Sequence, residues 1–239
     1  MDKKIFCLTI ALVLCTLTAF SQTAETPYTG TQKQQEDKEK PVVFRDRLVM
    51  DIYQTFWMGM PTQVNHMKFD PGFNVSALWD FKIKNKPLAV GLGVGITYNT
   101  QYSDALLQYN EVEDVMRYQI MPNTVHYNLL KMNYLACNIP VEFRYRNSNG
   151  FKFTVGAKVG LVCEVSQKYK GQNPTLAADT LMYKNLHFVN KSKYHVDVFT
   201  RIGWKFIDVY YNFQLTPLFT TGKGPKIYPM SVGISLSIF

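Results

Sequence analysis

A strict alternation of apolar and polar residues is the feature that most limits how this chain can fold. Between Leu88 and Ile96, apolar side chains occupy every second position, and Ala89 and three glycines stand between them. A period of two is that of a β-strand whose two faces meet different surroundings. The sequence beyond residue 46 therefore predicts strands that each carry one apolar face and one polar face.

Eight stretches with this pattern follow one another along the chain. They cover residues 47–56, 73–81, 88–97, 131–146, 151–165, 194–204, 207–215 and 230–238. A tilted membrane strand needs about 9–11 residues, which most of these stretches supply. Pro140 lies inside the fourth stretch and cannot donate a ladder hydrogen bond, so a bulge or local bend is expected there.

The connections between these stretches alternate strictly between short and long. The short ones are 84–87, 147–150 and 205–206, and the long ones are 57–71, 101–130, 166–193 and 216–228. Outer-membrane barrels have this arrangement, with tight periplasmic turns and long extracellular loops. Lipid offers an open strand edge no hydrogen-bond partners, so the first strand must pair with the last. The prediction is an all-β fold, an eight-stranded antiparallel transmembrane up-and-down β-barrel.

Alternation alone does not say which face points inward, and a soluble lipocalin-like barrel is the alternative. The polar face is rich in Gly, Ser, Thr and charge, which suits a narrow polar interior. Aromatic residues also gather near both strand ends, as in the interfacial girdles of membrane barrels. The predicted turn-side girdle is Trp79, Phe81, Phe143, Tyr145, Phe151, Phe153 and Trp204; the loop-side girdle is Phe56, Trp57, Phe73, Tyr98, Tyr194, Phe219 and Tyr228.

The first 45 residues have a different character. A charged start, an apolar run over residues 5–17 and small residues before Gln22 predict a signal peptide over 1–21. A lipoprotein signal on Cys15 is the alternative, which the bulky preceding Leu14 disfavours. Residues 22–45 are polar and predict a flexible periplasmic leader, and 46–239 form the barrel. The net charge of +8 then favours anionic lipid over nucleic acid as a partner.

Several fragments, in order along the chain, carry a family resemblance. They are FRDRLV at 44–49, GFNV at 72–75, NIPVEFR at 138–144, LTPLF at 215–219 and the piece from Gly224-Pro225 to 232–234. Over residues 44–239 the chain resembles the PorT-like outer-membrane β-barrel proteins of the Bacteroidota. The resemblance implies an eight-stranded barrel in the cell outer membrane. It also implies a link to protein secretion by the type IX pathway.

Charged residues on the polar face predict a plugged barrel. An eight-stranded barrel is just wide enough for side chains to fill, and buried charges must pair. We therefore expect an ion-pair network in the interior, with a gated proton or small-ion path as the alternative. Its predicted members are Asp51, Asp80, Glu142, Arg144, Lys158, Glu164, Asp197, Arg201 and Asp208.

Enzymatic chemistry has weak support in the sequence. A rim enzyme acting on lipid A or phospholipid would need a histidine beside a nucleophile or carboxylate. The candidates are His66, His126, His187 and His195, in or beside the predicted outer loops; His195 shares a strand face with Asp197. No nucleophile motif accompanies them, and no close ligand pairs suggest a metal. We expect a non-enzymatic protein with no cofactor and no metal, and the rim enzyme remains the alternative.

The third long loop is basic, with Lys168, Lys170, Lys184, Lys191 and Lys193. These lysines are predicted to face lipopolysaccharide phosphates, or else to form a docking surface for a protein or ligand. The expected partners are outer-membrane lipid, lipopolysaccharide, the barrel insertion machinery and envelope or secretion-system proteins. Cys137 and Cys163 fall on the predicted lipid face of neighbouring strands, where unpaired apolar thiols are expected.

Overall fold

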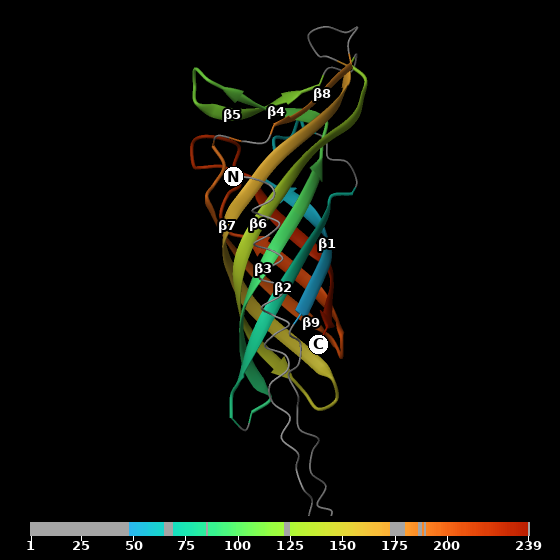
Figure 1. The fold of residues 1–239 in the computed structure, drawn as a ribbon, viewed down its shortest axis with the longest axis vertical. Helices are drawn as coiled ribbons and strands as arrows, with labels where there is room; N and C mark the ends of the chain where they lie inside the picture. Colours follow the sequence, from blue (N-terminus) through green and yellow to red (C-terminus); the bar gives the residue numbers. More distant parts are fainter. Residues whose placement is uncertain are drawn as a thin grey trace, which may run out of the picture. The chain divides into compact units, whose positions relative to one another are not determined.

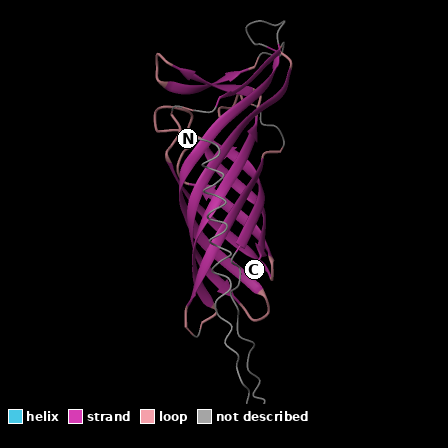
Figure 2. Cartoon of the chain, viewed as in Figure 1, coloured by secondary structure: helices cyan, strands magenta, loops and turns pink. Residues whose placement is uncertain are grey.

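The computed structural model describes residues 48–64, 69–84, 86–121, 125–172, 180–185, 188 and 190–238. The predicted signal peptide (1–21) and leader (22–45) lie outside the described residues. The described part forms eleven strands (Figures 1 and 2). They are β1 (Leu48–Met58), β2 (Pro71–Lys82), β3 (Leu88–Tyr102), β4 (Ala105–Asn110), β5 (Val115–Ile120), β6 (Tyr127–Arg146), β7 (Phe151–Gln172), β8 (Thr180–Asn185), β9 (Tyr194–Trp204), β10 (Ile207–Gln214) and β11 (Tyr228–Ile238).

Eight of these strands close into an antiparallel barrel, as predicted. The order is β6-β3-β2-β1-β11-β10-β9-β7, and the pairing of β7 with β6 completes the ring. The first and last strands pair over their full lengths, from Leu48 opposite Ile238 to Met58 opposite Tyr228. The barrel therefore leaves no open edge among its eight strands, which confirms the predicted closure.

No helix in the described part of the chain is long and apolar enough to cross a membrane.

Burial along the barrel strands alternates with the sequence pattern. In β1, Asp51, Tyr53 and Thr55 are buried, whereas Ile52 and Phe56 are exposed. The polar face therefore points inward and the apolar face points outward, as the composition of the two faces predicted. The exposed apolar side chains form a belt around the wall, which includes Ile52, Phe73, Leu92, Val94, Ile139, Val141, Val155, Val159, Leu161, Val198, Ile202, Val209, Val232 and Ile234.

Two members of the predicted loop-side girdle are misplaced. Trp57 is 4% exposed and Phe219 is 1% exposed, so both belong to the interior. Trp57 has the same strand phase as Tyr53, which is also buried. Phe219 lies in the β10–β11 loop, where the period of two does not apply.

The strands β6 and β7 are longer than predicted, and a bulge interrupts their ladder. Ala136 pairs with Val162, but the next residue, Leu135, pairs with Glu164. Cys163 is therefore the extra residue, and the phase of β7 reverses beyond it. Val165, predicted on the outer face, is fully buried as a result.

Pro140 has a milder effect than expected. Its pairing with Lys158 on β7 is regular. On the β3 side the ladder skips two positions, between the pairs Leu92–Val141 and Gly95–Asn138, and then resumes in the same register. The missing N–H interrupts the ladder locally but creates no bulge.

The loop end of the barrel is closed by an apolar cluster to which the long connections and the upper parts of β6 and β7 contribute. Figure 1 shows β4, β5 and β8 at this upper end. The cluster, called the plug below, consists of Trp57, Leu107, Met116, Met132, Tyr134, Ala136, Val162, Val165, Phe188, Leu218, Phe219 and Ile227. The β4–β5 hairpin and the β8 strand were not predicted from the sequence.

Candidate functional site

Arg201 lies at the centre of the barrel interior. Its Nε and Nη2 donate to the two carboxylate oxygens of Asp51, both at 2.9 Å, and its Nη1 donates to Glu142 at 2.7 Å. All three side chains are buried. This two-pronged geometry matches a guanidinium to a carboxylate and gives strong, directional hydrogen bonds. Strands β9, β1 and β6 are thereby connected across the lumen.

The network continues toward the turn end. Arg144 donates from Nε to Glu142 at 2.7 Å and from Nη1 to Asp80 at 2.7 Å. Gly91 lies in register between Asp80 and Glu142. A Cβ at Gly91 would lie 3.4 Å from Nε of Arg144, so the missing side chain leaves room for the guanidinium. The glycines of β3 therefore serve packing inside the barrel.

Two further cations are held in the interior. Lys152 donates from Nζ to Asp208 and to the Ser237 hydroxyl, both at 2.9 Å. Lys158 donates to the Tyr210 hydroxyl at 2.6 Å, and its Nζ lies 4.9 Å from the Phe199 ring centroid. An ammonium over an aromatic face is stabilised by the ring quadrupole. Aromatic and charged residues thus fill the lumen together.

One predicted interior charge lies elsewhere. Glu164 pairs with Leu135, so the two residues share the outer face of the wall, and Glu164 is half-buried there. The Cys163 bulge is the cause, because it shifts every later residue of β7 by one position. The other predicted members all point into the barrel: Asp51, Asp80, Glu142, Arg144, Lys158, Asp197, Arg201 and Asp208. Lys152 was missed, although it has the same strand phase as Lys158.

The histidines are not arranged as a rim site. His195 is 1% exposed inside the barrel, with Nδ1 3.0 Å from the Asp197 carboxylate and its ring edge-on to Tyr134. It therefore shares a strand face with Asp197 next to a long loop, as predicted, but this face points into the lumen beneath the plug and not toward a lipid-facing rim. His126 is exposed at the loop end. His66 and His187 lie outside the described residues.

At the loop end, Asp114 fastens the β4–β5 hairpin to two other connections. Its carboxylate accepts hydrogen bonds from Lys223 and, at 2.8 Å, from the Tyr109 hydroxyl. Asn190 donates to the Asp114 backbone and side chain at 2.9 and 3.2 Å. The hydrogen bonds from Lys223, Tyr109 and Asn190 lower the pKa of Asp114 to about 2. We call these four residues the latch.

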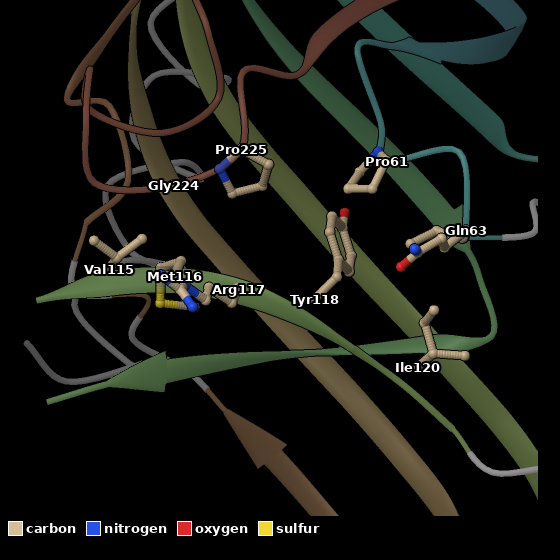
Figure 3. Close-up of a pocket in the computed structure, with 10 residues that line it drawn as sticks. Pro61, Gln63, Val115, Met116, Arg117, Tyr118, Ile120, Gly224 and Pro225 are labelled. Carbon is tan, nitrogen blue, oxygen red and sulfur yellow. The ribbon is translucent and has the colours of Figure 1, made fainter. Parts of the chain in front are cut away.

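Beside the latch, the loops enclose an open cavity of about 330 Å³ (Figure 3). Burial raises the pKa of Tyr118, whose hydroxyl donates to Gln101 at 3.3 Å. The cavity could hold an apolar group beside one guanidinium. Its lining includes Pro61, Val64, Met116, Arg117, Tyr118 and Pro225.

Lysines gather on the outer wall just beyond the apolar belt. Lys168 of β7 lies opposite Lys131 of β6 on this face. On its other side, the backbone of Lys168 pairs with that of Lys184 in β8, whose side chain lies outside the described part. Like charges that face one another across strands destabilise a sheet unless an anion lies near them. Lys170 and Lys193 are exposed, and half-buried Lys191 donates to the Cys163 carbonyl at 2.9 Å. Lys131 was missed from the sequence, because only the register brings it beside Lys168.

Within the described ranges, no group of three His, Cys, Asp or Glu side chains could hold a metal ion. No family model and no curated protein matches the chain. Among solved structures, the chain is similar to the crystal structure of Ail, the attachment invasion locus protein of Yersinia pestis, in complex with the heparin analogue sucrose octasulfate. The two are 10% identical, the match covers 79% of this chain and 95% of that chain, and the TM-score is 0.35. The eight-stranded barrel described above rests on the strand pairing of this chain itself.

Proposed function

We propose that this protein is an integral outer-membrane β-barrel that performs no catalysis and acts through its loop end as a structural or interaction component of the cell envelope. The observation that carries the proposal is the distribution of polarity across the wall. Charged side chains such as Arg201 and Glu142 are buried in the lumen, while Val159 and Val209 are 54% and 63% exposed on the outside. A soluble barrel has the opposite arrangement.

The outer apolar belt supports insertion into lipid. The largest exposed apolar patch of a soluble monomer is about 300–600 Å². Here apolar residues face outward on all eight barrel strands, so the belt encircles the molecule. In water this surface would be an aggregation hazard, whereas hydrocarbon would cover it.

The filled interior supports a role for the loops. The ion-pair network occupies the turn half of the lumen, and the plug covers the loop half. Side chains therefore take the place that water would need for solute passage. The surface left for recognition consists of the latch, the adjacent cavity and the lysines around Lys168.

Those lysines support lipopolysaccharide as the nearest partner. Lys131, Lys168 and Lys170 lie just beyond the belt, at the level where lipid phosphates would begin. The barrel insertion machinery is a further partner that the outer-membrane proposal entails. An envelope or secretion-system protein is a finer proposal, and its link to type IX secretion rests on the family resemblance. Co-purification from crosslinked outer membranes would identify such a partner.

A rim enzyme acting on lipid is less well supported. His195 and Asp197 are buried below the plug, out of reach of a lipid at the rim. Substituting His126 by Ala and analysing lipid A and phospholipid composition tests the exposed candidate. A changed lipid composition would favour the enzyme over the proposal.

The membrane proposal is tested by a charge placed on the belt. Val159→Arg should destabilise the barrel in bilayers by about 2–4 kcal/mol, the cost of an arginine near the midplane. Val112→Arg is the matched control, because Val112 is 95% exposed in the hairpin turn. Equal stability of the two variants, or a processed protein that stays in the supernatant without detergent after high-speed centrifugation, would overturn the proposal.

A further inference from the structure

Two cysteine side chains meet on the outer wall where β6 and β7 cross from the belt to the loop end. The Sγ atoms of Cys137 and Cys163 are 3.1 Å apart, in direct contact. Both are free thiols in the structure. Since a disulfide requires two side chains that point toward each other from adjacent backbones, this geometry is close to what the bond needs.

The bulge explains why these two thiols meet. Cys137 pairs with Leu161, so Cys163 would lie diagonally opposite, at about 7–8 Å in a regular ladder. Cys163 is the extra residue of the bulge, and a bulge bends the strand and redirects a side chain. The irregularity that reverses the phase of β7 therefore also directs one thiol toward the other.

The surroundings of the pair make it accessible. Below it on the outer face lie exposed Ile139 and Leu161, and beyond it lies half-buried Glu164. The ammonium of Lys191 donates to the Cys163 carbonyl at 2.9 Å. Cys163 itself is exposed, so a reagent at the water–lipid boundary can reach its sulfur.

We infer that Cys137 and Cys163 form a disulfide in the mature protein. The inference rests on the proposed function in one respect, because export would bring the chain into an oxidising compartment. The oxidant is a protein disulfide of the thiol-oxidase class. The Cys163 thiolate attacks that disulfide, which forms a mixed disulfide and releases one oxidase thiolate. The Cys137 thiolate then attacks Sγ of Cys163 and releases the second oxidase thiolate. The oxidase gains two electrons, and the two thiol protons pass to water.

The bond would fix the register of the two longest strands. The ladder of β6 and β7 changes register at this point, between Leu135 and Ala136. Strand register can slip where the pattern is weak. A covalent link at the bulge would hold the upper parts of both strands, and with them the lysines and the plug, in one alignment.

The experiment is alkylation of the protein isolated from outer membranes, denatured in SDS with excess maleimide, followed by intact-mass measurement. We expect a mass two hydrogens below the reduced value and no maleimide added, and two maleimides added after reduction. Two maleimides added without reductant would overturn the inference. Cys163→Ser is the control, and it should take one maleimide with or without reductant.

A second arm separates this inference from the proposed function. The purified folded barrel is reduced, freed of reductant and treated with diamide at low protein concentration. Rapid formation of an intramolecular bond would show that the geometry is suitable wherever the protein is located. If the protein is reduced as isolated and diamide yields only free thiols or crosslinked dimers, the inference that these two thiols can form a bond is refuted. Failure of the protein to reach the membrane would refute only the proposed function.

Discussion

Removing the central guanidinium gives the sharpest test of how the barrel interior is held together. Arg201→Met keeps an unbranched side chain but deletes three hydrogen bonds to Asp51 and Glu142. Each hydrogen bond to a charged group contributes about 1.5–3 kcal/mol. Part of the loss is offset, because Asn74 still donates to Asp51 at 2.7 Å and Arg144 still donates to Glu142.

The expected loss of unfolding free energy is about 3–5 kcal/mol, the typical cost of leaving one side of a buried ion pair without its partner. A typical domain has about 5–15 kcal/mol in total, so the variant should fold but be marginal. Arg201→Lys keeps the charge without the planar fork and should lose an intermediate amount. Adding Asp51→Asn to Arg201→Met removes one uncompensated carboxylate and should recover part of the loss.

The assay is urea unfolding of the barrel refolded in lipid vesicles, followed by tryptophan fluorescence and by gel mobility without boiling. Arg117→Met is the control, because Arg117 pairs with Glu113 on the exposed hairpin. Exposed pairs of this kind contribute at most about 1 kcal/mol. If Arg201→Met lost no more stability than Arg117→Met, the reasoning about buried charge in this lumen would be refuted.

Three further predictions concern single positions. Gly93→Ala should prevent or strongly impair folding, because the new Cβ would overlap the backbone carbonyl oxygen of Ala77. Gly91→Ala is the control, because its Cβ would meet only side chains that can move, and the refolding yields of the two variants are compared. The pKa of Asp114 is lowered to about 2, so the latch should be intact above pH 4 and should loosen as the pH falls through about 2. At pH 4, pepsin should therefore cleave the hairpin of Asp114→Asn faster than that of the wild type, and equal rates at this pH would refute the role of the carboxylate. Burial raises the pKa of Asp70 to about 6, so between pH 4 and pH 6 this carboxyl stays protonated in the folded protein but ionises in the unfolded chain. The free energy of unfolding should therefore fall as the pH rises through this range, by at most about 1.4 kcal/mol per pH unit. Asp70→Asn should abolish that slope in urea titrations.

The barrel could be predicted from the sequence wherever the wall separates lipid-like from polar surroundings. Residues 194–204 were predicted as one strand, and β9 has the same limits. The pattern is strong there because each side chain of β9 must suit one face or the other, as Val198 and Arg201 do. The same alternation predicts which charged residues point into the lumen, where they must pair.

The pattern fails above the belt, because the polarity of the two faces inverts. There Met132 and Tyr134 are buried inside, while Lys131 and Lys168 lie on the outer face. This part of the wall is packed like a soluble protein: apolar and polar residues still alternate, but the apolar ones point inward and the polar ones point outward. The single extra residue at Cys163 hides the change in β7, which is why the sequence predicts Glu164 inside and a loop at residues 166–172. In β6 the predicted strand begins only four residues late, at 131 instead of 127.

If the barrel lies in the outer membrane as proposed, the length of β7 determines how far the protein reaches from the bilayer. A strand of 22 residues, at about 3.3 Å per residue, is about 70 Å long, and a tilt of about 45° leaves about 50 Å along the barrel axis. The apolar band of such barrels is only about 25 Å tall, so about half of β7 stands above it. In the proposed outer-membrane location, the upper parts of β6 and β7 would therefore stand above the headgroups as a two-stranded extension of the wall. Deleting residues from β6 and β7 in matched pairs would shorten this extension by a few ångströms at a time, and so would test whether the proposed recognition at the loop end depends on its height.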